Sequence, residues 1–122
     1  MKLLIVEDNS GVRRLIRRVV ASMADEIREC ADGAEALALC AAERPDVVLM
    51  DIQMKTMDGI TATRHITAAD PSARVIMVTD YDQPDLREAA RQAGACGYVV
   101  KNNLLEIVRS LEALGAQNRG ST

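Results

Sequence analysis

Three acidic residues, one threonine and one lysine stand at the carboxyl ends of short apolar runs in this sequence. These residues are Glu7, Asp8, Asp51, Thr79 and Lys101. Clustered carboxylates repel one another unless a cation neutralises them, and oxygen-only ligands favour a partly hydrated Mg²⁺. A further carboxylate can attack phosphorus to give an aspartyl phosphate, while a lysine and a hydroxyl bind the phosphoryl oxygens. If the fold brings these five residues together, the pattern predicts phosphoryl transfer.

Short apolar runs alternate with helical patterns along the chain. The runs at residues 3–6, 47–50, 75–78 and 98–100 are continuous and rich in β-branched residues, which is typical of strands buried on both faces of a parallel sheet. Residues 27–30 mix charged and apolar types and predict an edge strand. Apolar residues at helical spacing predict helices within residues 12–20, 34–41, 60–66, 86–93 and 104–111.

This alternation predicts an α/β fold of five βα units. Strands separated by helices run parallel with right-handed crossovers, and five units in this length fit a flavodoxin-like, doubly wound sheet of order 2-1-3-4-5. Ligands bind such sheets at the carboxyl ends of the strands, where the five polar residues stand. We expect one domain over residues 1–116 and a polar tail, or the start of a linker, over residues 117–122.

Local signals set the expected helix boundaries. Pro71 ends the third helix, Gly94 and Gly115 end the fourth and fifth, and Pro84 suits the first turn of the fourth.

Composition excludes several classes of protein. The chain has 122 residues, is 48% hydrophobic and carries a net charge of −3, which argues against a nucleic-acid-binding surface. No apolar run is long enough to span a membrane and no signal peptide is apparent. Cys30, Cys40 and Cys96 show neither CxxC nor zinc spacing and lie in apolar patterns, so we expect buried free thiols and a cytoplasmic location.

Each polar residue has an ordinary explanation when taken alone. An acid after a strand is often a solvated loop residue or a helix cap, a threonine there is often a cap, and a lysine is usually on the surface. Their joint placement on successive strand ends makes coincidence a poor explanation. His65, the only histidine, is expected to be a surface residue.

Five motifs in order resemble those of receiver domains from bacterial two-component response regulators, of the chemotaxis-regulator type. They are LIVEDN at residues 4–9, VLMDIQM at 48–54, MDG at 57–59, VT at 78–79 and GACGYVVK at 94–101. The resemblance spans residues 2 to about 115. It implies that Asp51 is the phosphoacceptor and that Asp8, Asp51 and the backbone carbonyl of Gln53 bind Mg²⁺, with Glu7 acting through a metal-bound water.

The resemblance also implies a conformational switch and a set of partners. Lys101 would pair with the acceptor and then with the phosphoryl group, Thr79 would turn toward that group, and Tyr98 would rotate inward behind it. A sensor histidine kinase would supply the phosphoryl group, and an output domain or effector protein would respond, in some receivers through a phosphorylation-dependent homodimer. We expect a signalling domain that assists its own phosphotransfer and dephosphorylation, not an enzyme with a separate substrate.

Three positions depart from the family pattern. Lys55 and Asn102 stand where proline is common, so no cis peptide is expected after Lys101, and the asparagine pair at 102–103 is a candidate cap for the last helix. Asp80 stands where a small residue is usual. It either crowds the cleft and repels a phosphodonor, or points outward and caps the turn into the Pro84 helix.

Three other functions compete with this interpretation. A haloacid dehalogenase-type phosphatase needs a second acid where Gln53 stands, and also a cap domain. A flavin or nucleotide carrier needs a glycine- and hydroxyl-rich first loop, whereas Glu7 and Asp8 would repel phosphate. The serious alternative is a degenerate receiver, which keeps the fold and acts only as a phosphorylation-independent interaction module.

Overall fold

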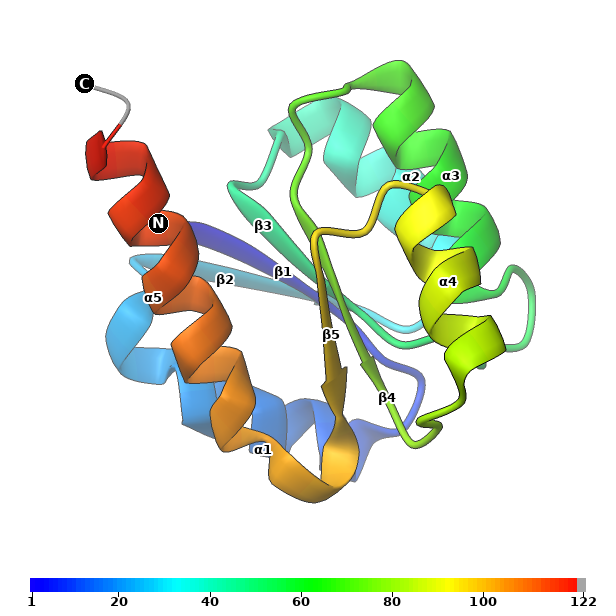
Figure 1. The fold of residues 1–122 in the computed structure, drawn as a ribbon, viewed down its shortest axis with the longest axis horizontal. Coiled ribbons are helices and arrows are strands. Elements are labelled where there is room, and N and C mark those ends of the chain that lie inside the picture. Colours follow the sequence, from blue (N-terminus) through cyan, green and yellow to red (C-terminus); the bar gives the residue numbers. More distant parts are fainter. Residues whose placement is uncertain (121–122) are drawn as a thin grey trace.

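Five parallel strands form one sheet in the computed structural model of the chain, which describes the backbone of residues 1–120 and side chains as far as Gly115. The strands are β1 (Lys2–Val6), β2 (Glu26–Cys30), β3 (Val47–Met50), β4 (Val75–Thr79) and β5 (Gly97–Val100). They lie in the order β2-β1-β3-β4-β5 (Figure 1). The flavodoxin-like α/β fold and the strand order are therefore confirmed, with β2 at an edge.

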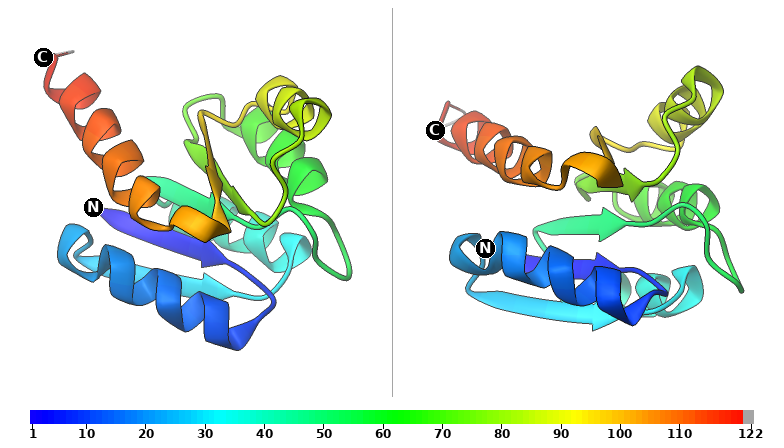
Figure 2. Two further views of the ribbon diagram at one scale, coloured as in Figure 1. Left: turned by 60° about the horizontal axis from the view of Figure 1, so that its bottom comes forward. Right: turned by 90° about the horizontal axis from the view of Figure 1, so that it is seen from below.

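Helices cover both faces of this sheet. They are α1 (Ser10–Val20), α2 (Gly33–Glu43), α3 (Gly59–Ala69), α4 (Pro84–Gln92) and α5 (Leu105–Gly120), with 3-10 turns η1 (Ala21–Met23) and η2 (Lys101–Asn103). Helices α1 and α5 lie on one face, and α2, α3 and α4 lie on the other (Figures 1 and 2). This three-layer arrangement leaves the carboxyl ends of the strands free to carry a site.

Successive residues of each strand feed two separate cores. Leu3 and Ile5 pack into the α1 and α5 side with Ile16 and Ile107. Leu4, Val6, Val48 and Met50 pack into the other side, where α2, α3 and α4 contribute Ala36, Ala62 and Ala90. Side chains alternate between the faces of a strand, so a continuous apolar run supplies both layers at once.

Most helix boundaries follow the local signals in the sequence. Helix α3 ends at Ala69 before Pro71, Pro84 opens α4, and Gly94 follows α4 with a φ of 106°. The expectation for Gly115 is wrong, because α5 continues through it to Gly120. A glycine can stay within a helix at a modest cost unless the following chain needs a positive φ. The asparagine pair does not cap the helix but lies in the η2 turn with Lys101.

The cysteines are free, as expected, but not all are buried. Cys30 is buried, Cys40 is half-buried and Cys96 is exposed. Cys96 directly precedes β5, where its backbone N–H donates to the carbonyl oxygen of Val75 (2.8 Å). It therefore lies at the amino end of an edge strand, outside the covered middle of the sheet, which an apolar sequence context does not reveal.

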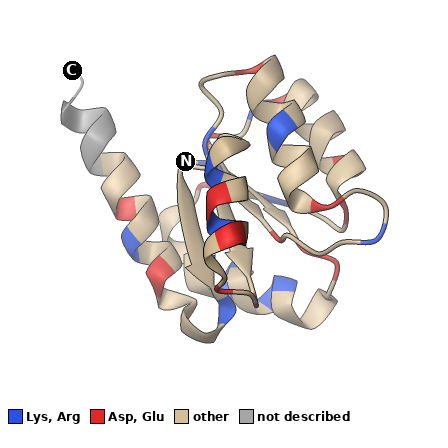
Figure 3. Ribbon diagram, turned by 45° about the vertical axis from the view of Figure 1, so that its right-hand side comes forward, with Lys and Arg blue, Asp and Glu red and all other residues tan. Residues whose placement is uncertain are grey.

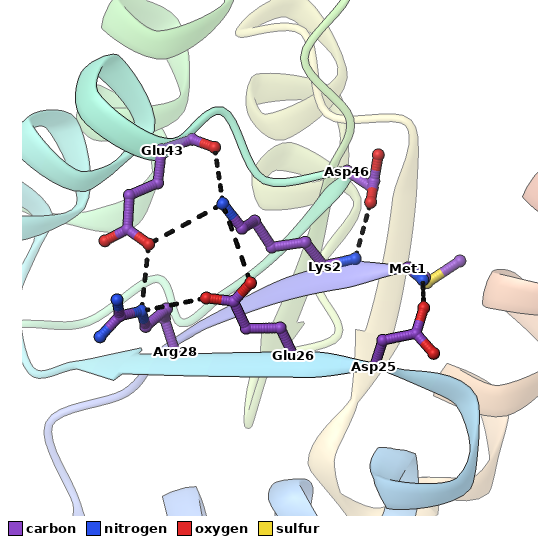
Figure 4. A network of polar contacts seen from close by, with 7 residues as sticks. All are labelled: Met1, Lys2, Asp25, Glu26, Arg28, Glu43 and Asp46. Carbon is purple, nitrogen blue, oxygen red and sulfur yellow. Dashed lines mark hydrogen bonds and ion pairs between the residues drawn. The ribbon is translucent and has the colours of Figure 1, made fainter.

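A polar network closes the amino-terminal end of the sheet (Figure 4). The Lys2 ammonium donates to the carbonyl oxygen of Glu43 (3.1 Å) and lies 4.0 Å from the carboxylate of Glu26. The amino group of Met1 pairs with Asp25, and Arg28 pairs with both Glu26 and Glu43. Charges along β2 also discourage edge-to-edge pairing with another chain.

Charged residues of both signs are interspersed over the helices and loops (Figure 3). Among the described residues, none of the helices has the length and apolar character needed to cross a membrane.

The packing of Gly59 against the backbone of Asp51 can be tested by substitution. A Cβ at Gly59 would lie 1.9 Å from the carbonyl oxygen of Asp51, so backbone would have to move. We expect Gly59→Ala to lower the free energy of unfolding by roughly 1–3 kcal/mol in urea denaturation.

Gly115→Ala is the matched control, because a Cβ there meets nothing within 4 Å. It should be neutral or stabilise the protein by up to about 1 kcal/mol, since alanine favours the helix. Equal effects of the two substitutions would contradict the packing described here.

Candidate functional site

Backbone pairing brings two acidic residues side by side at the carboxyl ends of β1 and β3. The N–H of Glu7 donates to the carbonyl oxygen of Cys30 (3.1 Å), which extends the β1–β2 pairing by one residue. The N–H of Asp51 donates to the carbonyl oxygen of Val6 (2.9 Å), which does the same between β3 and β1. Glu7 is 1% exposed and Asp51 is 6% exposed, so both carboxylates are held in the protein interior.

The Lys101 ammonium bridges these two carboxylates from the end of β5. Its Nζ lies 2.6 Å from Oε1 of Glu7 and 3.2 Å from Oδ1 of Asp51. A third carboxylate, that of Asp80 after β4, has its Oδ2 at 4.0 Å from the same ammonium. Residues that follow four of the strands thus meet at the Lys101 ammonium group.

Burial and mutual repulsion dominate the electrostatics of the site. Burial raises the pKa of Asp51 most, the charge of Glu7 raises it further, and Lys101 offsets only part of this, leaving the pKa at about 7. Burial lowers the pKa of Lys101, but its hydrogen bond to Glu7 and the charge of Asp51 outweigh burial, so the pKa lies above its ordinary value. Without a further cation the pocket holds more negative charge than Lys101 can balance.

Carboxylate oxygens of Glu7, Asp8 and Asp51 approach one another within 4.8 Å. An all-oxygen donor set of this kind suits a hard divalent cation such as Mg²⁺. Asp8 is exposed, so an ion here would keep part of its hydration shell. Asn9 supports the loop, since its N–H donates to Oε2 of Glu7 (3.1 Å) and its side chain caps α1 at Val12. The residues present therefore fit a magnesium ion.

A hydrogen-bonded chain links β5 to the loop that follows β3. The Tyr98 hydroxyl donates to the carbonyl oxygen of Tyr81 (2.6 Å). The Tyr81 hydroxyl donates to Oε1 of Gln53 (3.1 Å), and the Tyr81 N–H donates to Oγ1 of Thr79 (3.3 Å). The guanidinium of Arg87 stacks 4.5 Å from the centre of the Tyr98 ring. Tyr81 thus contacts three of the residues that the sequence singled out.

Sequence reasoning missed Tyr81. The available signal was an aromatic residue two positions after the strand-end threonine, in a loop that must pass over the carboxyl edge of the sheet. Thr79 is fully buried, and its hydroxyl oxygen accepts the hydrogen bond from Tyr81.

Asp80 lies at the mouth of the site and is not a helix cap. Gln83 precedes α4, and no side chain caps that helix. The Asp80 side chain is 71% exposed, with its carboxylate directed to Lys101 at 4.0 Å. The capping alternative is therefore wrong. His65, on α3, is exposed as expected and lies apart from this cluster.

Comparisons with known proteins agree with this arrangement. Residues 3–112 match the family model of the response regulator receiver domain. The chemotaxis protein CheY of Listeria monocytogenes is 38% identical over 115 residues, which cover 93% of this chain and 95% of that protein. A LuxR-family two-component response regulator from Aurantimonas sp. SI85-9A1 has a crystal structure that matches with a TM-score of 0.88 at 34% identity, over 95% of this chain and 85% of that one.

Other relatives are longer. The transcriptional regulatory protein PrrA of Mycobacterium tuberculosis is 34% identical over 122 residues, which cover 99% of this chain but 52% of PrrA. The chain thus spans about half the length of the transcriptional regulators that it matches.

The raised pKa of Asp51 makes a prediction about stability. In the unfolded chain an aspartate has a pKa of about 4, so folding penalises ionised Asp51 progressively from pH 4 to pH 7 and fully above that range. In metal-free buffer, Asp51→Asn should raise the free energy of unfolding by about 1–3 kcal/mol at pH 8 and much less at pH 5. Lys101 keeps its bond to Glu7 in this variant.

Asp58→Asn is the control of opposite sign. Burial raises the pKa of Asp58, but hydrogen bonds from Thr61 outweigh it and leave the pKa lowered. The ionised carboxylate therefore adds stability above its unfolded pKa, and its loss should be felt at pH 8 and fade toward low pH. Asp51→Asn effects that are the same at pH 5 and pH 8 would contradict the assignment.

Proposed function

The chain belongs to the response regulator receiver domain family, and from this premise we propose that Asp51 accepts a phosphoryl group from a sensor histidine kinase. The observation that carries the proposal is the Lys101 ammonium held between Glu7 and Asp51 (2.6 and 3.2 Å) at the end of the central strand. This places a carboxylate nucleophile next to a fixed cation, which phosphoryl transfer requires.

In the proposed reaction, one Asp51 carboxylate oxygen attacks the phosphorus of the donor. A bond from phosphorus to this oxygen forms as the bond from phosphorus to the donor's leaving atom breaks, and an acyl phosphate results. Deprotonated Asp51 is needed, so its pKa of about 7 must fall when a second cation arrives. Lys101 remains close to the developing charge on the phosphoryl oxygens.

We assign Mg²⁺ to the acidic loop next to Asp51. Asp8 and Asp51, two members of the acidic cluster, would bind it directly. By analogy with the family, the backbone carbonyl of Gln53 would be a third ligand and Glu7 would act through a water molecule. When bound, the ion would neutralise charge on the transferring phosphoryl oxygens. Since three carboxylates face one another here, they repel one another in the metal-free protein. Binding of a divalent cation relieves this repulsion and is therefore favourable.

Thr79 and Tyr98 are proposed to form the switch. The hydrogen bonds of Tyr81 to both residues and to Gln53 support this, because a change at the acceptor loop would be felt directly at β5. The surface of α4, β5 and α5 would then change with phosphorylation and contact an effector protein, an output domain or a second copy of the chain. Free cysteines support a cytoplasmic location.

Substitution of Asp51 tests its role as the phosphoacceptor. Asp51→Asn should abolish labelling by acetyl phosphate in the presence of Mg²⁺, because the nucleophilic oxygen is replaced by an amide. Asp58→Asn should label like the parent, since Asp58 only caps α3. Phosphate incorporation can be followed by intact mass. Undiminished labelling of Asp51→Asn would overturn the assignment, and an unlabelled parent would favour the degenerate receiver.

Removal of the metal or of one of its proposed ligands tests the role of Mg²⁺. EDTA should abolish labelling, and Asp8→Ala should reduce it by at least about tenfold at limiting Mg²⁺, because one direct ligand is lost. Asp46→Ala is the control, as the Asp46 carboxylate accepts a hydrogen bond from the Lys2 N–H at the opposite end of the sheet. The metal role is wrong if labelling proceeds in EDTA.

Substitution of Asp80 tests whether its carboxylate slows phosphorylation. Its carboxylate adds negative charge beside Lys101 at the entrance, and the repulsion of an incoming phosphate is worth about 1 kcal/mol after solvent screening. Asp80→Ala should therefore label about fivefold faster at low ionic strength, with the gain fading as salt is added. Rates that are unchanged at every salt concentration would leave Asp80 without a role in phosphorylation.

A further inference from the structure

A second cavity lies between α2 and α3, at the end of the sheet opposite to Asp51. Its volume is about 230 Å³. Its wall is mostly apolar and includes Leu37, Cys40, Val48, Ile66 and Ala69. Val48 is three residues before Asp51 on β3, roughly 10 Å along the strand. The crevice is therefore separate from the phosphorylation site.

Two opposite charges line this crevice. Arg44 and Asp70 both line it, as does His65, and Arg44 and Asp70 also line a second, more polar depression of about 580 Å³. Oδ1 of Asp70 accepts hydrogen bonds from the N–H and the hydroxyl of Ser72 (3.0 and 2.6 Å). These bonds, aided by the charge of Arg44, lower the pKa of Asp70. The carboxylate is thus fixed in orientation and ionised at neutral pH.

The backbone of Arg44 gives a second, independent observation. Arg44 follows the end of α2 with φ 46° and ψ 65°, and its N–H donates to the carbonyl oxygen of Cys40 (3.1 Å). Within residues 1–115 it is the single non-glycine residue with a positive φ. This left-handed conformation favours glycine, because a Cβ crowds the backbone there. A position whose backbone favours glycine is thus occupied by an arginine, and this arginine lines the crevice.

We propose that this crevice binds a zwitterionic amino acid with an apolar side chain. Arg44 would hold the carboxylate, Asp70 would hold the ammonium group, and the side chain would enter the cavity beside Val48. An apolar cavity of about 150 Å³ accommodates benzene, so 230 Å³ suits a branched aliphatic chain or one aromatic ring. A simple anion would face Asp70 and a simple cation would face Arg44, which disfavours both.

The test is an NMR titration of the intact ¹⁵N-labelled chain with three probes. They are L-leucine, 4-methylpentanoate, which lacks the ammonium group, and isoamylamine, which lacks the carboxylate. Leucine should shift amide signals around the crevice, and each of the other probes should bind at least about tenfold more weakly. Asp51→Asn should bind leucine like the parent, which separates this site from the proposed phosphorylation.

Arg44→Gly is the decisive variant, because it removes the guanidinium and relieves the backbone strain. Its melting temperature should be unchanged or higher, while its affinity for leucine falls at least about tenfold. Arg14→Ala, on the exposed face of α1, should bind like the parent. The proposal is overturned if leucine fails to shift the crevice signals, if the three probes bind equally, or if Arg44→Gly keeps the parent affinity.

Discussion

Lys101 carries one positive charge into a pocket where two buried carboxylates meet. Its ammonium lies 2.6 Å from Glu7 and 3.2 Å from Asp51, and the exposed Asp80 approaches to 4.0 Å. Because one ammonium group cannot balance three carboxylates, the carboxylates repel one another in the folded protein, and this repulsion lowers its stability. Burial of the Asp51 carboxyl, together with the charge of Glu7, outweighs Lys101 and raises the pKa of Asp51 to about 7.

The hydrogen bonds of the parallel sheet hold Glu7 and Asp51 next to each other despite this repulsion. Glu7 continues the β1–β2 pairing by one residue and Asp51 continues the β3–β1 pairing by one residue, so their separation is set by the sheet and not by loop conformation. The close approach of Gly59 to the carbonyl of Asp51 fixes the chain that follows. Burial of the two apolar cores on either side of the sheet stabilises the fold and offsets the unfavourable free energy of this charge repulsion.

The sequence predicted the architecture well because its signals are local. Continuous β-branched runs mark buried parallel strands, and the polar residue that ends each run must lie at the shared carboxyl edge. The contacts of Tyr81 with Gln53 and Tyr98 were beyond reach, since they depend on how one loop folds over another. The positive φ of Arg44 was equally hidden, because no glycine marks it. Gly115 is the opposite case, because a glycine is present but the helix does not end there and α5 continues to Gly120. A glycine predicts a helix end only where the chain changes direction.

Lys101 alone leaves Asp51 with a raised pKa, and a second cation is expected to lower it. Side-chain ¹³C NMR of Asp51 across a pH titration, with and without saturating Mg²⁺, tests this most directly. The metal-free protein should give an apparent pKa near 7, since burial and Glu7 outweigh Lys101. Bound Mg²⁺ should move the transition to much lower pH, because the ion favours the charged form. A metal-free pKa near the ordinary value of about 4, or a titration that Mg²⁺ leaves unchanged, would contradict this account.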